Sequence, residues 1–264
     1  MTTVVKIGGA AGNETGPVLD DLVARPDCVL VHGGSAEVDR LGEVLGRPSE
    51  YYTSPSGVVS RRSDPGHLEV VVLALAGKIQ TDLVAGLARR GVRAVGLSGV
   101  DGSLVVARRR EGVRAVKDGR VIHLSDDRSG TVERVDAGLL RLILGAGVVP
   151  VVGPPAVTSK GEVVNVDADR VAAQVAIALG AASLIYLTNV PGLLRDKDDP
   201  STVIERVARD GLPEAVSVAQ GRMRKKLIAA REALEGGVQR VVIASSQGFG
   251  PIARALRGEG TVLE

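Results

Sequence analysis

Short runs of β-branched and aliphatic residues alternate along the chain with longer segments in which apolar positions recur at helical spacing. The short runs predict strands at Val4–Ile7, Val29–His32, Ala94–Leu97, Val148–Val152, Leu184–Leu187 and Arg240–Ala244. The longer segments predict a helix that ends near Leu45, a helix from the N-cap Asp64 to about Arg90, and helices at Ala137–Leu144, Asp169–Leu179 and Met223–Leu234. This alternation predicts an α/β fold with a mostly parallel central sheet that helices cover on both faces.

Two regions interrupt the alternation of strands and helices. Arg47 to Ser63 is rich in Ser, Pro, Gly and Tyr without a periodic pattern, so we expect a long loop there. Ser103 to Val135 is typical of short strands, and Lys117-Asp118-Gly119-Arg120 within it carries the Asp-Gly signal of a tight hairpin turn. No repeat or linker is evident. The 264 residues are therefore expected to form a single domain with a β-hairpin insertion.

Composition and charge exclude several classes of function. The chain has 33 basic and 31 acidic side chains, and this balance argues against a general nucleic-acid binder. Three Tyr, one Phe and no Trp make a base-stacking platform for single strands improbable. Three His and one Cys predict no zinc cluster, and Cys28 lies in an apolar run typical of a buried strand.

Neither a secretion signal nor a membrane span is expected. No charged leader followed by an apolar stretch opens the sequence. The apolar region Leu139–Val157 is interrupted by one arginine, two glycines and a proline. We therefore expect a soluble cytoplasmic protein that contacts neither membrane nor nucleic acid.

Two glycine pairs are the first candidates for chemistry. Gly8-Gly9 and Gly33-Gly34 each follow a predicted strand, and the second pair leads directly into a predicted helix. Such turns suit phosphate, because glycine allows a ligand close to the backbone and a helix start offers free N–H groups. Glycine also occurs in these turns for purely geometric reasons. Neither pair belongs to the dinucleotide motif G-x-G-x-x-G, and the phosphate-binding motif G-x-x-x-x-G-K-[ST] is absent from the sequence.

Two lysines are candidates for binding an anion. Lys6 lies in an apolar strand directly before a glycine pair, where a buried charge is costly unless it meets an anion. Lys226 lies near the start of a predicted helix, where a bound phosphate would offset its unfavourable interaction with the helix dipole. The alternative interpretation of Lys6 is a lysine on an edge strand, and that of Lys226 is a solvated basic patch.

Two further segments place polar side chains where a strand or loop meets a helix. Asn165-Val166-Asp167-Ala168-Asp169 offers helix caps or groups that hold lysines in place. Ser60-Arg61-Arg62-Ser63-Asp64 offers guanidinium groups suited to a carboxylate, although exposed arginine pairs are often only surface charge.

Taken together, these segments resemble the amino acid kinase family, and within it the carboxylate kinases related to N-acetylglutamate kinase. The matching motifs are those around Lys6, His32, Arg61, Asn165 and Lys226, together with Leu187-Thr188-Asn189-Val190-Pro191-Gly192-Leu193. Their order and spacing span nearly the whole chain.

Finer details resemble one branch of that family, the kinases that act on an amino acid held by a small carrier protein. The residues that carry this likeness are His32–Ser35, Thr53–Gly57, Ser60–Asp64, Ser129–Glu133 and Ala219–Met223. The sequence departs from the acetylglutamate kinase pattern at Asn189, where that group usually has Asp.

The resemblance implies ATP-dependent phosphorylation of a side-chain carboxylate, that of α-aminoadipate or glutamate on an acidic amino-group carrier protein, to give an acyl phosphate. It implies a lobe at residues 1–179 that binds the acceptor and forms a homodimer, and a nucleotide-binding lobe at residues 180–264. Mg²⁺ would bridge the β- and γ-phosphates with few direct protein ligands. Because a carboxylate is already ionised, such a reaction depends on positioning and charge neutralisation.

The resemblance also implies residue roles. Lys6 and Lys226 would contact the transferred phosphoryl group, and Asp169 would orient both. Backbone N–H groups of Gly8, Gly9, Gly33 and Gly34 would bind phosphate oxygens. Arg61 and Asn165 would hold the acceptor, and Asn189 with Gly192 would line the nucleotide site.

Two alternatives stay open. The first is an N-acetylglutamate kinase of arginine biosynthesis. The second is a non-catalytic module on the same fold that senses ATP or an effector, although a sensor has no need for two lysines converging on a γ-phosphate.

Overall fold

An eight-stranded sheet forms the centre of the molecule, with the strand order β14-β16-β15-β13-β1-β2-β10-β5. The computed structural model describes residues 2–55, 57, 59–117 and 119–264. The strands of the sheet are β1 Thr3–Ile7, β2 Cys28–His32, β5 Ala94–Ser98, β10 Val149–Gly153, β13 Ser183–Thr188, β14 Arg206–Val207, β15 Arg240–Ser245 and β16 Thr261–Leu263. All pairings within it are parallel except the pairing of β15 with β16. The predicted, mostly parallel sheet is confirmed.

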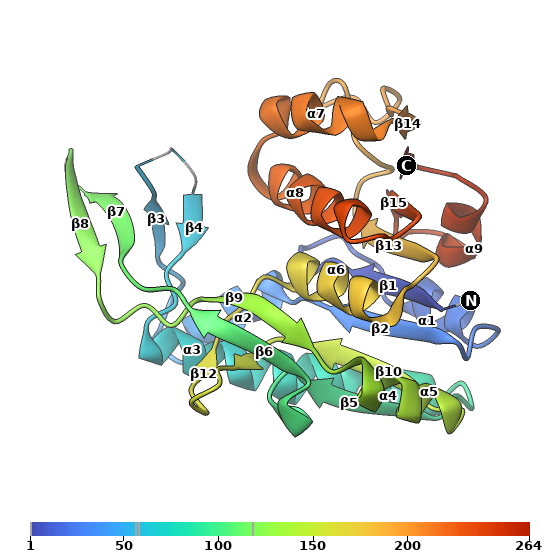
Figure 1. The fold of residues 1–264 in the computed structure, drawn as a ribbon, viewed down its shortest axis with the longest axis horizontal. Helices are drawn as coiled ribbons and strands as arrows, with labels where there is room; N and C mark the ends of the chain where they lie inside the picture. The colour runs from blue at the N-terminus through green and yellow to red at the C-terminus, as the bar shows by residue number, and fades with distance from the viewer. Residues whose placement is uncertain (1, 56, 58, 118) are drawn as a thin grey trace.

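Helices cover both faces of this sheet (Figure 1). They are α1 Gly16–Leu22, α2 Ser35–Val44, α3 Pro65–Val71, α4 Gln80–Ala88, α5 Ala137–Gly145, α6 Ala168–Leu179, α7 Leu212–Val218, α8 Gly221–Glu235 and α9 Pro251–Leu256. The two faces follow from the period of two along each strand: in β1, Val4 packs in the core beneath α5, α6 and α8, whereas Val5 packs beneath α1, α4 and α9. Because both faces are buried, the strands are continuously apolar.

The helix predicted from Asp64 to about Arg90 is present, and it runs without a break through α3 and α4. Asp64 caps it by accepting a hydrogen bond from the His67 N–H at 2.8 Å, and a π-helical stretch, Val72–Ile79, joins α3 to α4. Over Pro65–Ala88 it is the one helix among the described residues that is long and apolar enough to cross a membrane by length and composition alone. In this fold it packs against the sheet, and 44% of its most apolar window is buried.

The prediction of a long loop at Arg47–Ser63 is wrong. The segment forms a hairpin of β3 Tyr51–Thr53 and β4 Val59–Arg61. These strands have three residues each and no apolar alternation, so the sequence signal for them is weak. They are held by pairing with β7 Val113–Lys117, where Thr53 lies opposite Val116.

The insertion predicted at Ser103–Val135 is confirmed as strands. The hairpin of β7 and β8 (Arg120–Leu124) pairs Lys117 with Arg120 across a two-residue turn, although Asp118 of that turn lies outside the described residues. The four-stranded sheet β4-β3-β7-β8, which we call the wing, projects from the body at the left of Figure 1. A second small sheet has the order β12-β11-β6-β9 and is made of β6 Val105–Arg109, β9 Gly130–Val135, β11 Ala156–Val157 and β12 Val163–Val164.

A buried polar pair ties the long helix to the central sheet. His32 and Gln80 are 1% and 6% exposed, and His32 Nε2 lies 3.1 Å from Gln80 Oε1. Gln80 donates its amide hydrogen to the Val151 carbonyl at 3.3 Å, and this bond sets the amide orientation, so His32 Nε2 is the donor to Gln80. Burial lowers the pKa of His32.

Glycines make room for this pair. A Cβ added at Gly153 would overlap the His32 ring, and one added at Gly96 would lie 2.6 Å from Gln80 Nε2. Both contacts lie in the close-packed interior, where the neighbouring side chains cannot move aside freely.

We expect Gly153→Ala to lower the free energy of unfolding by about 1–3 kcal/mol, the usual cost of overpacking a core. Urea denaturation measures it. The matched control is Gly145→Ala at the end of α5, where an added Cβ meets nothing within 4 Å. Equal stability of the two variants would contradict this account of Gly153.

Candidate active site

The candidate site lies at the carboxyl edge of the central strands, where the chain changes direction across the sheet. From β1 the strands β2, β10 and β5 extend to one side, and β13 and β15 to the other. Ligands of open α/β sheets bind in the crevice outside such a switch point. The turns after β1, β2 and β13 all end at this edge.

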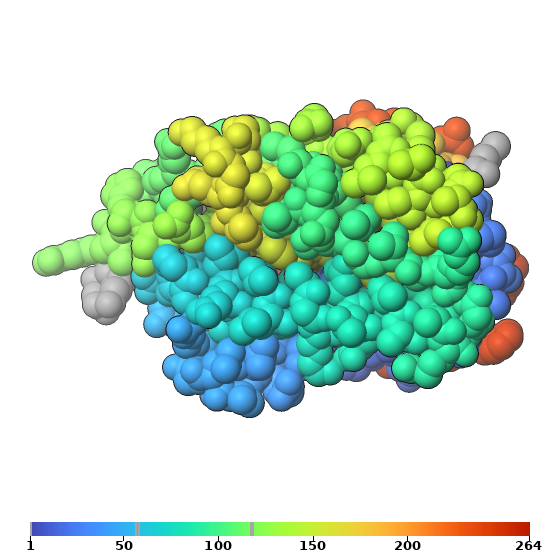
Figure 2. Space-filling model, turned by 90° about the horizontal axis from the view of Figure 1, so that it is seen from below, coloured from blue at the N-terminus to red at the C-terminus, as the bar shows by residue number. Residues whose placement is uncertain are grey.

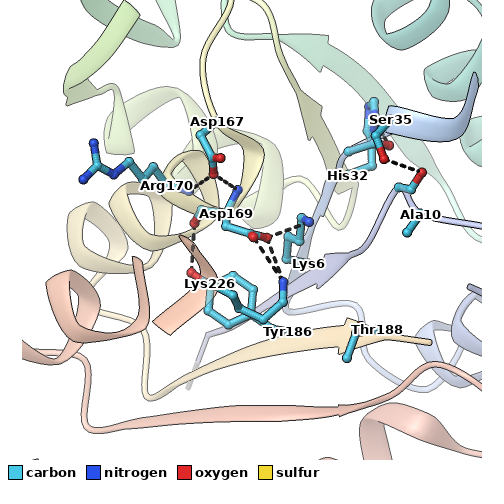
Figure 3. Close-up of polar contacts among 12 residues, drawn as sticks. Lys6, Ala10, His32, Ser35, Asp167, Asp169, Arg170, Tyr186, Thr188 and Lys226 are labelled. Atoms are coloured by element: carbon cyan, nitrogen blue, oxygen red, sulfur yellow. Dashed lines mark hydrogen bonds and ion pairs between the residues drawn. The ribbon is translucent and has the colours of Figure 1, made fainter. Parts of the chain in front are cut away.

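Three charged side chains meet here (Figure 3). Lys6 Nζ lies 2.6 Å from Asp169 Oδ1, and Lys226 Nζ lies 3.1 Å from both oxygens of the same carboxylate. The side chains are 7%, 12% and 7% exposed for Lys6, Asp169 and Lys226. The three residues come from β1, α6 and α8, so the predicted convergence of the two lysines on Asp169 is present in the fold.

The strand register explains why these groups meet. Lys6 follows Val4 by two positions, so it points to the face that α6 and α8 cover. Lys6 pairs in register with Tyr186 of β13, whose ring lies 4.7 Å from Lys226 Nζ. The Tyr186 hydroxyl donates to the backbone carbonyl of Asp169 at 2.8 Å. Sequence reasoning missed Tyr186, because within its apolar strand it is typical of a core residue.

The start of α6 frees Asp169 for this cluster. The N-cap of the helix is Asp167, which accepts from the backbone N–H groups of Asp169 and Arg170 at 2.9 and 3.2 Å. The carboxylate of Asp169 therefore has no capping task and turns toward the lysines.

The cluster holds two positive charges against one negative charge. Burial alone would raise the pKa of Asp169, but Lys226 and Lys6 together hold that pKa well below its ordinary value. Burial lowers the pKa of Lys226, an effect that Asp169 opposes and the neighbouring Lys6 charge reinforces. An excess of one positive charge in a largely dry setting favours an anionic ligand.

The two glycine pairs differ in what their N–H groups do. The N–H of Gly8 donates to the Leu187 carbonyl at 2.9 Å, and the N–H of Gly33 donates to the Ile7 carbonyl at 3.2 Å. Within the described part of the chain, the N–H groups of Gly9 and Gly34 have no such acceptor. Gly9 and Gly34 are thus the glycines whose N–H groups remain free for a ligand.

These two turns touch each other. A Cβ at Gly9 would overlap the backbone of Gly34, and the Gly9 carbonyl accepts from the Ser35 hydroxyl at 3.0 Å and the Ala36 N–H at 2.8 Å. Beside them, the position of a Cβ on Gly33 lies 3.7 Å from Lys6 Nζ and 3.6 Å from the Gly9 nitrogen. A side-chain methyl on Gly33 would thus lie in van der Waals contact with an ammonium group and a free N–H, and without it this position suits a phosphate oxygen.

The predicted acceptor residues lie on neighbouring segments. Arg61 donates to Asp39 at 2.7 Å and to the Tyr51 hydroxyl at 3.0 Å, and its buried Nε has no hydrogen-bond partner among the residues described. Asn165 donates its side-chain amide to the Ser63 hydroxyl at 3.0 Å. Arg62 forms ion pairs with Glu50 and Asp126 on the surface, and among the described residues its buried Nε, like that of Arg61, has no hydrogen-bond partner.

Asn189 and Gly192 lie in the turn that follows β13. Asn189 donates to the Ala11 carbonyl at 3.1 Å and so closes the turn after β13 onto the turn after β1. A Cβ at Gly192 would lie 2.6 Å from the Thr261 hydroxyl, which also accepts from the Leu193 N–H. Gly192 thus allows the turn to pack against β16, a requirement set by residues far away in sequence.

Residues 1–245 match the model of the amino acid kinase family. The chain belongs to the amino acid kinase family. It is similar to the [LysW]-aminoadipate kinases of Deinococcus radiodurans (46% identity, 98% of this chain and 90% of the relative) and Thermus thermophilus (43%, 98% and 99%). It is also similar to the acetylglutamate kinase of Methanopyrus kandleri, at 39% identity over 98% of this chain and 99% of the relative.

Among solved structures, this amino acid kinase resembles an N-acetylglutamate synthase from Neisseria gonorrhoeae bound to coenzyme A and N-acetyl-glutamate. The TM-score is 0.79 at 28% identity, over 99% of this chain and 59% of that one. A carbamate kinase from Giardia lamblia bound to AMP-PNP has the same fold, with a TM-score of 0.66 at 14% identity over 99% of this chain and 98% of that one.

We expect Gly33→Ala to leave the thermal midpoint unchanged and to reduce kcat/KM for ATP about 10²-fold. The new methyl group has room in the free protein but fills the space beside Lys6, and misplacement of a reacting group by about 1 Å has effects of this size. Steady-state kinetics with ATP as the varied substrate measure it.

The control is Gly16→Ala, at the first position of α1, where an added Cβ meets nothing within 4 Å. Normal use of ATP by Gly33→Ala would show that no phosphate binds above Gly33.

Proposed function

We propose that this kinase transfers the γ-phosphoryl group of ATP to the side-chain carboxylate of α-aminoadipate, or of glutamate, held on an amino-group carrier protein. The observation that carries the proposal is the buried Lys6–Asp169–Lys226 cluster, with its excess positive charge beside two free N–H groups. The names of the relatives at 43–46% identity support the carrier-bound acceptor.

Phosphoryl transfer to a carboxylate requires mainly that negative charge be neutralised. An oxygen of the acceptor carboxylate forms a bond to the γ-phosphorus while the bond to the β,γ-bridging oxygen breaks, which yields an acyl phosphate and ADP. Both reactants are anions, so Lys6 and Lys226 lower the repulsion between them, and no general base is needed. Asp169 holds the two ammonium groups together, and the N–H groups of Gly9 and Gly34 bind phosphate oxygens.

Mg²⁺ fits this scheme as an ion that arrives with the nucleotide. Among the residues that the structure describes, no three His, Cys, Asp or Glu side chains gather to hold a metal. Both oxygens of Asp169 are already occupied by lysine. When bound between the β- and γ-phosphates, Mg²⁺ would neutralise charge on the transferred group.

The two lobes divide the substrates. In residues 1–179, Arg61 with its unpaired Nε and Asn165 are suited to the carboxylate end of the acceptor. Residues 180–264 would bind the nucleotide, with Asn189 and Gly192 in the turn that follows β13. Function in the cytoplasm follows from the need for ATP.

We assign the homodimer contact to the first lobe. The outer side of the helix Pro65–Ala88 faces the viewer in Figure 2, and Leu73 on it is 48% exposed. A second copy that packs on this helix would bury Leu73.

The wing is the proposed docking surface for an acidic carrier. Arg114 is exposed on one face of the β7–β8 hairpin together with the apolar Val121, which is 53% exposed, and Arg120 is exposed on the other face. The wing leads through β4 directly to Arg61 in the acceptor site. The arginines at 108–110 are less suited, because Arg108 pairs with Glu133 and Arg109 binds backbone carbonyls.

N-acetylglutamate kinase remains the second candidate, because the relative from Methanopyrus kandleri with that name matches 98% of this chain. A sensing module is disfavoured, since a protein that only senses ATP has no use for two buried lysines that share one carboxylate.

We expect Lys6→Ala and Lys226→Ala each to lower kcat by about 10²–10³, the scale of losing one preorganised charge at a transition state. The matched control is Lys225→Ala, the neighbour of Lys226, which lies outside the cluster. Stopped-time assays of ADP release measure the turnover. Near-normal turnover in either variant would refute the role of that lysine.

We also expect carrier-bound α-aminoadipate or glutamate to be used far better than free N-acetylglutamate. Its kcat/KM falls steeply as salt rises from about 50 to 500 mM, because screening shortens the reach of exposed charges. The assay compares carrier-bound α-aminoadipate, carrier-bound glutamate and N-acetylglutamate. Better use of the free acetylated amino acid, with no salt effect on the carrier, would favour the second candidate.

A further inference from the structure

A buried carboxylate outside the phosphoryl site lies under the acceptor end. Asp127, in the connection between β8 and β9, is 1% exposed. Its Oδ2 accepts from the Ser63 N–H at 3.3 Å, and its Oδ1 accepts from the N–H of Ser129 at 2.8 Å and from the Ser129 hydroxyl. No ion pair involves Asp127 within the described residues. A carboxylate without a cation in the interior depends on such donors, so their loss is costly.

Asp127 lies where three distant segments meet. The Arg128 N–H donates to the Ser63 carbonyl at 2.6 Å, and the Asn165 N–H donates to the Arg128 carbonyl at 2.8 Å. The Gly130 N–H then donates to the Asn165 carbonyl at 2.7 Å. The segment 127–130 therefore lies between Ser63 and Asn165 and bonds to the backbone of both.

This junction explains the Ser129-Gly130 motif, for which the proposed reaction has no direct use. Ser129 gives Asp127 two of its donors. A Cβ at Gly130 would lie 2.8 Å from the Val164 side chain, so glycine allows β9 to approach the residue before Asn165 closely. Both residues serve the packing of the loop onto the Asn165 segment.

The side chains at the junction are those of the acceptor site. Asn165 spends one amide hydrogen on the Ser63 hydroxyl, and its amide oxygen has no protein partner in the part of the chain described. Ser63 follows Arg61 by two residues, so the backbone that Asp127 binds also carries Arg61. The lysine cluster and the glycine turns make no hydrogen bond to Asp127.

We propose that Asp127 is a positioning residue that sets the orientation of Asn165 and Arg61 toward the acceptor through its hydrogen bond to Ser63. This inference rests on the proposed function, because the acceptor role of Asn165 and Arg61 is part of it. Asp127 controls the use of the acceptor and leaves the use of ATP unchanged.

The test is Asp127→Asn, which keeps size and shape. One amide orientation sets an NH₂ group against the Ser63 N–H, and the other sets it against the Ser129 donors, so one contact is lost either way. We expect KM for the acceptor to rise about tenfold or more, the scale of one buried donor left unpaired. KM for ATP and kcat stay near their wild-type values, whereas the thermal midpoint falls by a few degrees, because a buried donor left unpaired also destabilises the fold. The matched control is Asp126→Asn, whose partner Arg62 is on the surface, and we expect all its parameters to stay within about twofold.

A second variant covers the case in which Asp127→Asn fails to fold. Ser129→Ala removes the hydroxyl that donates to Asp127 Oδ1 and keeps the Ser129 N–H and the Asp127 carboxylate in place. It too raises KM for the acceptor alone. An unchanged acceptor KM in Asp127→Asn, or in Ser129→Ala where the first variant does not fold, overturns the inference. Equal rises in the KM values for acceptor and ATP also overturn it, because they indicate a merely structural role.

The wild type separates this inference from the proposed function. A wild-type enzyme that phosphorylates one of the three acceptors, with an Asp127→Asn variant that matches it, contradicts the inference alone. A wild-type enzyme that phosphorylates none of them contradicts the proposed function, and the inference falls with it.

Discussion

The carboxylate of Asp169, held between Lys6 and Lys226, is the interaction on which the rest of the site depends. Two ammonium groups this close repel each other, and burial raises that cost. One shared carboxylate makes their proximity stable and still leaves a positive charge for a ligand. Asp169 lies in the first turn of α6. Because Asp167 caps that helix, the Asp169 side chain is free to turn toward the lysines.

The surrounding structure keeps this arrangement rigid. Lys6 lies on a central strand with a neighbour on each side, and its register with Tyr186 brings the Lys226 ammonium beneath the same edge. The glycine turns approach each other so closely that a side chain at Gly9 would overlap its neighbour. A site of this kind acts through preorganised charge, and its precision comes from the strands and the helix start on which the charged groups lie.

The acceptor side is built differently. It depends on short strands, an irregular connection and the buried Asp127, which has hydrogen bonds but no ion pair with any residue that the structure describes. The proposed phosphoryl side thus lies on the regular geometry of a parallel sheet, whereas the proposed acceptor side lies on short segments, part of the insertion among them, whose backbone is fixed by individual hydrogen bonds. Such a division allows one chemistry to be combined with different acceptors, because the insertion can change without disturbing the lysine cluster.

Periodicity by itself determined the central sheet, its two covered faces and the long helix from Asp64, because long apolar patterns leave few alternatives. An unexpected lysine in an apolar strand and the motifs around Asp169 and Lys226 were enough to identify the family and the cluster. Tertiary structure alone decided that the N–H groups of Gly8 and Gly33 donate to the carbonyls of neighbouring strands. It also decided that the segment expected as a loop pairs with β7, and that Asp127 lies at the junction of the Ser63 and Asn165 segments. Each of these features depends on partners distant in sequence. A local pattern of residues does not indicate which distant backbone group accepts or donates a hydrogen bond.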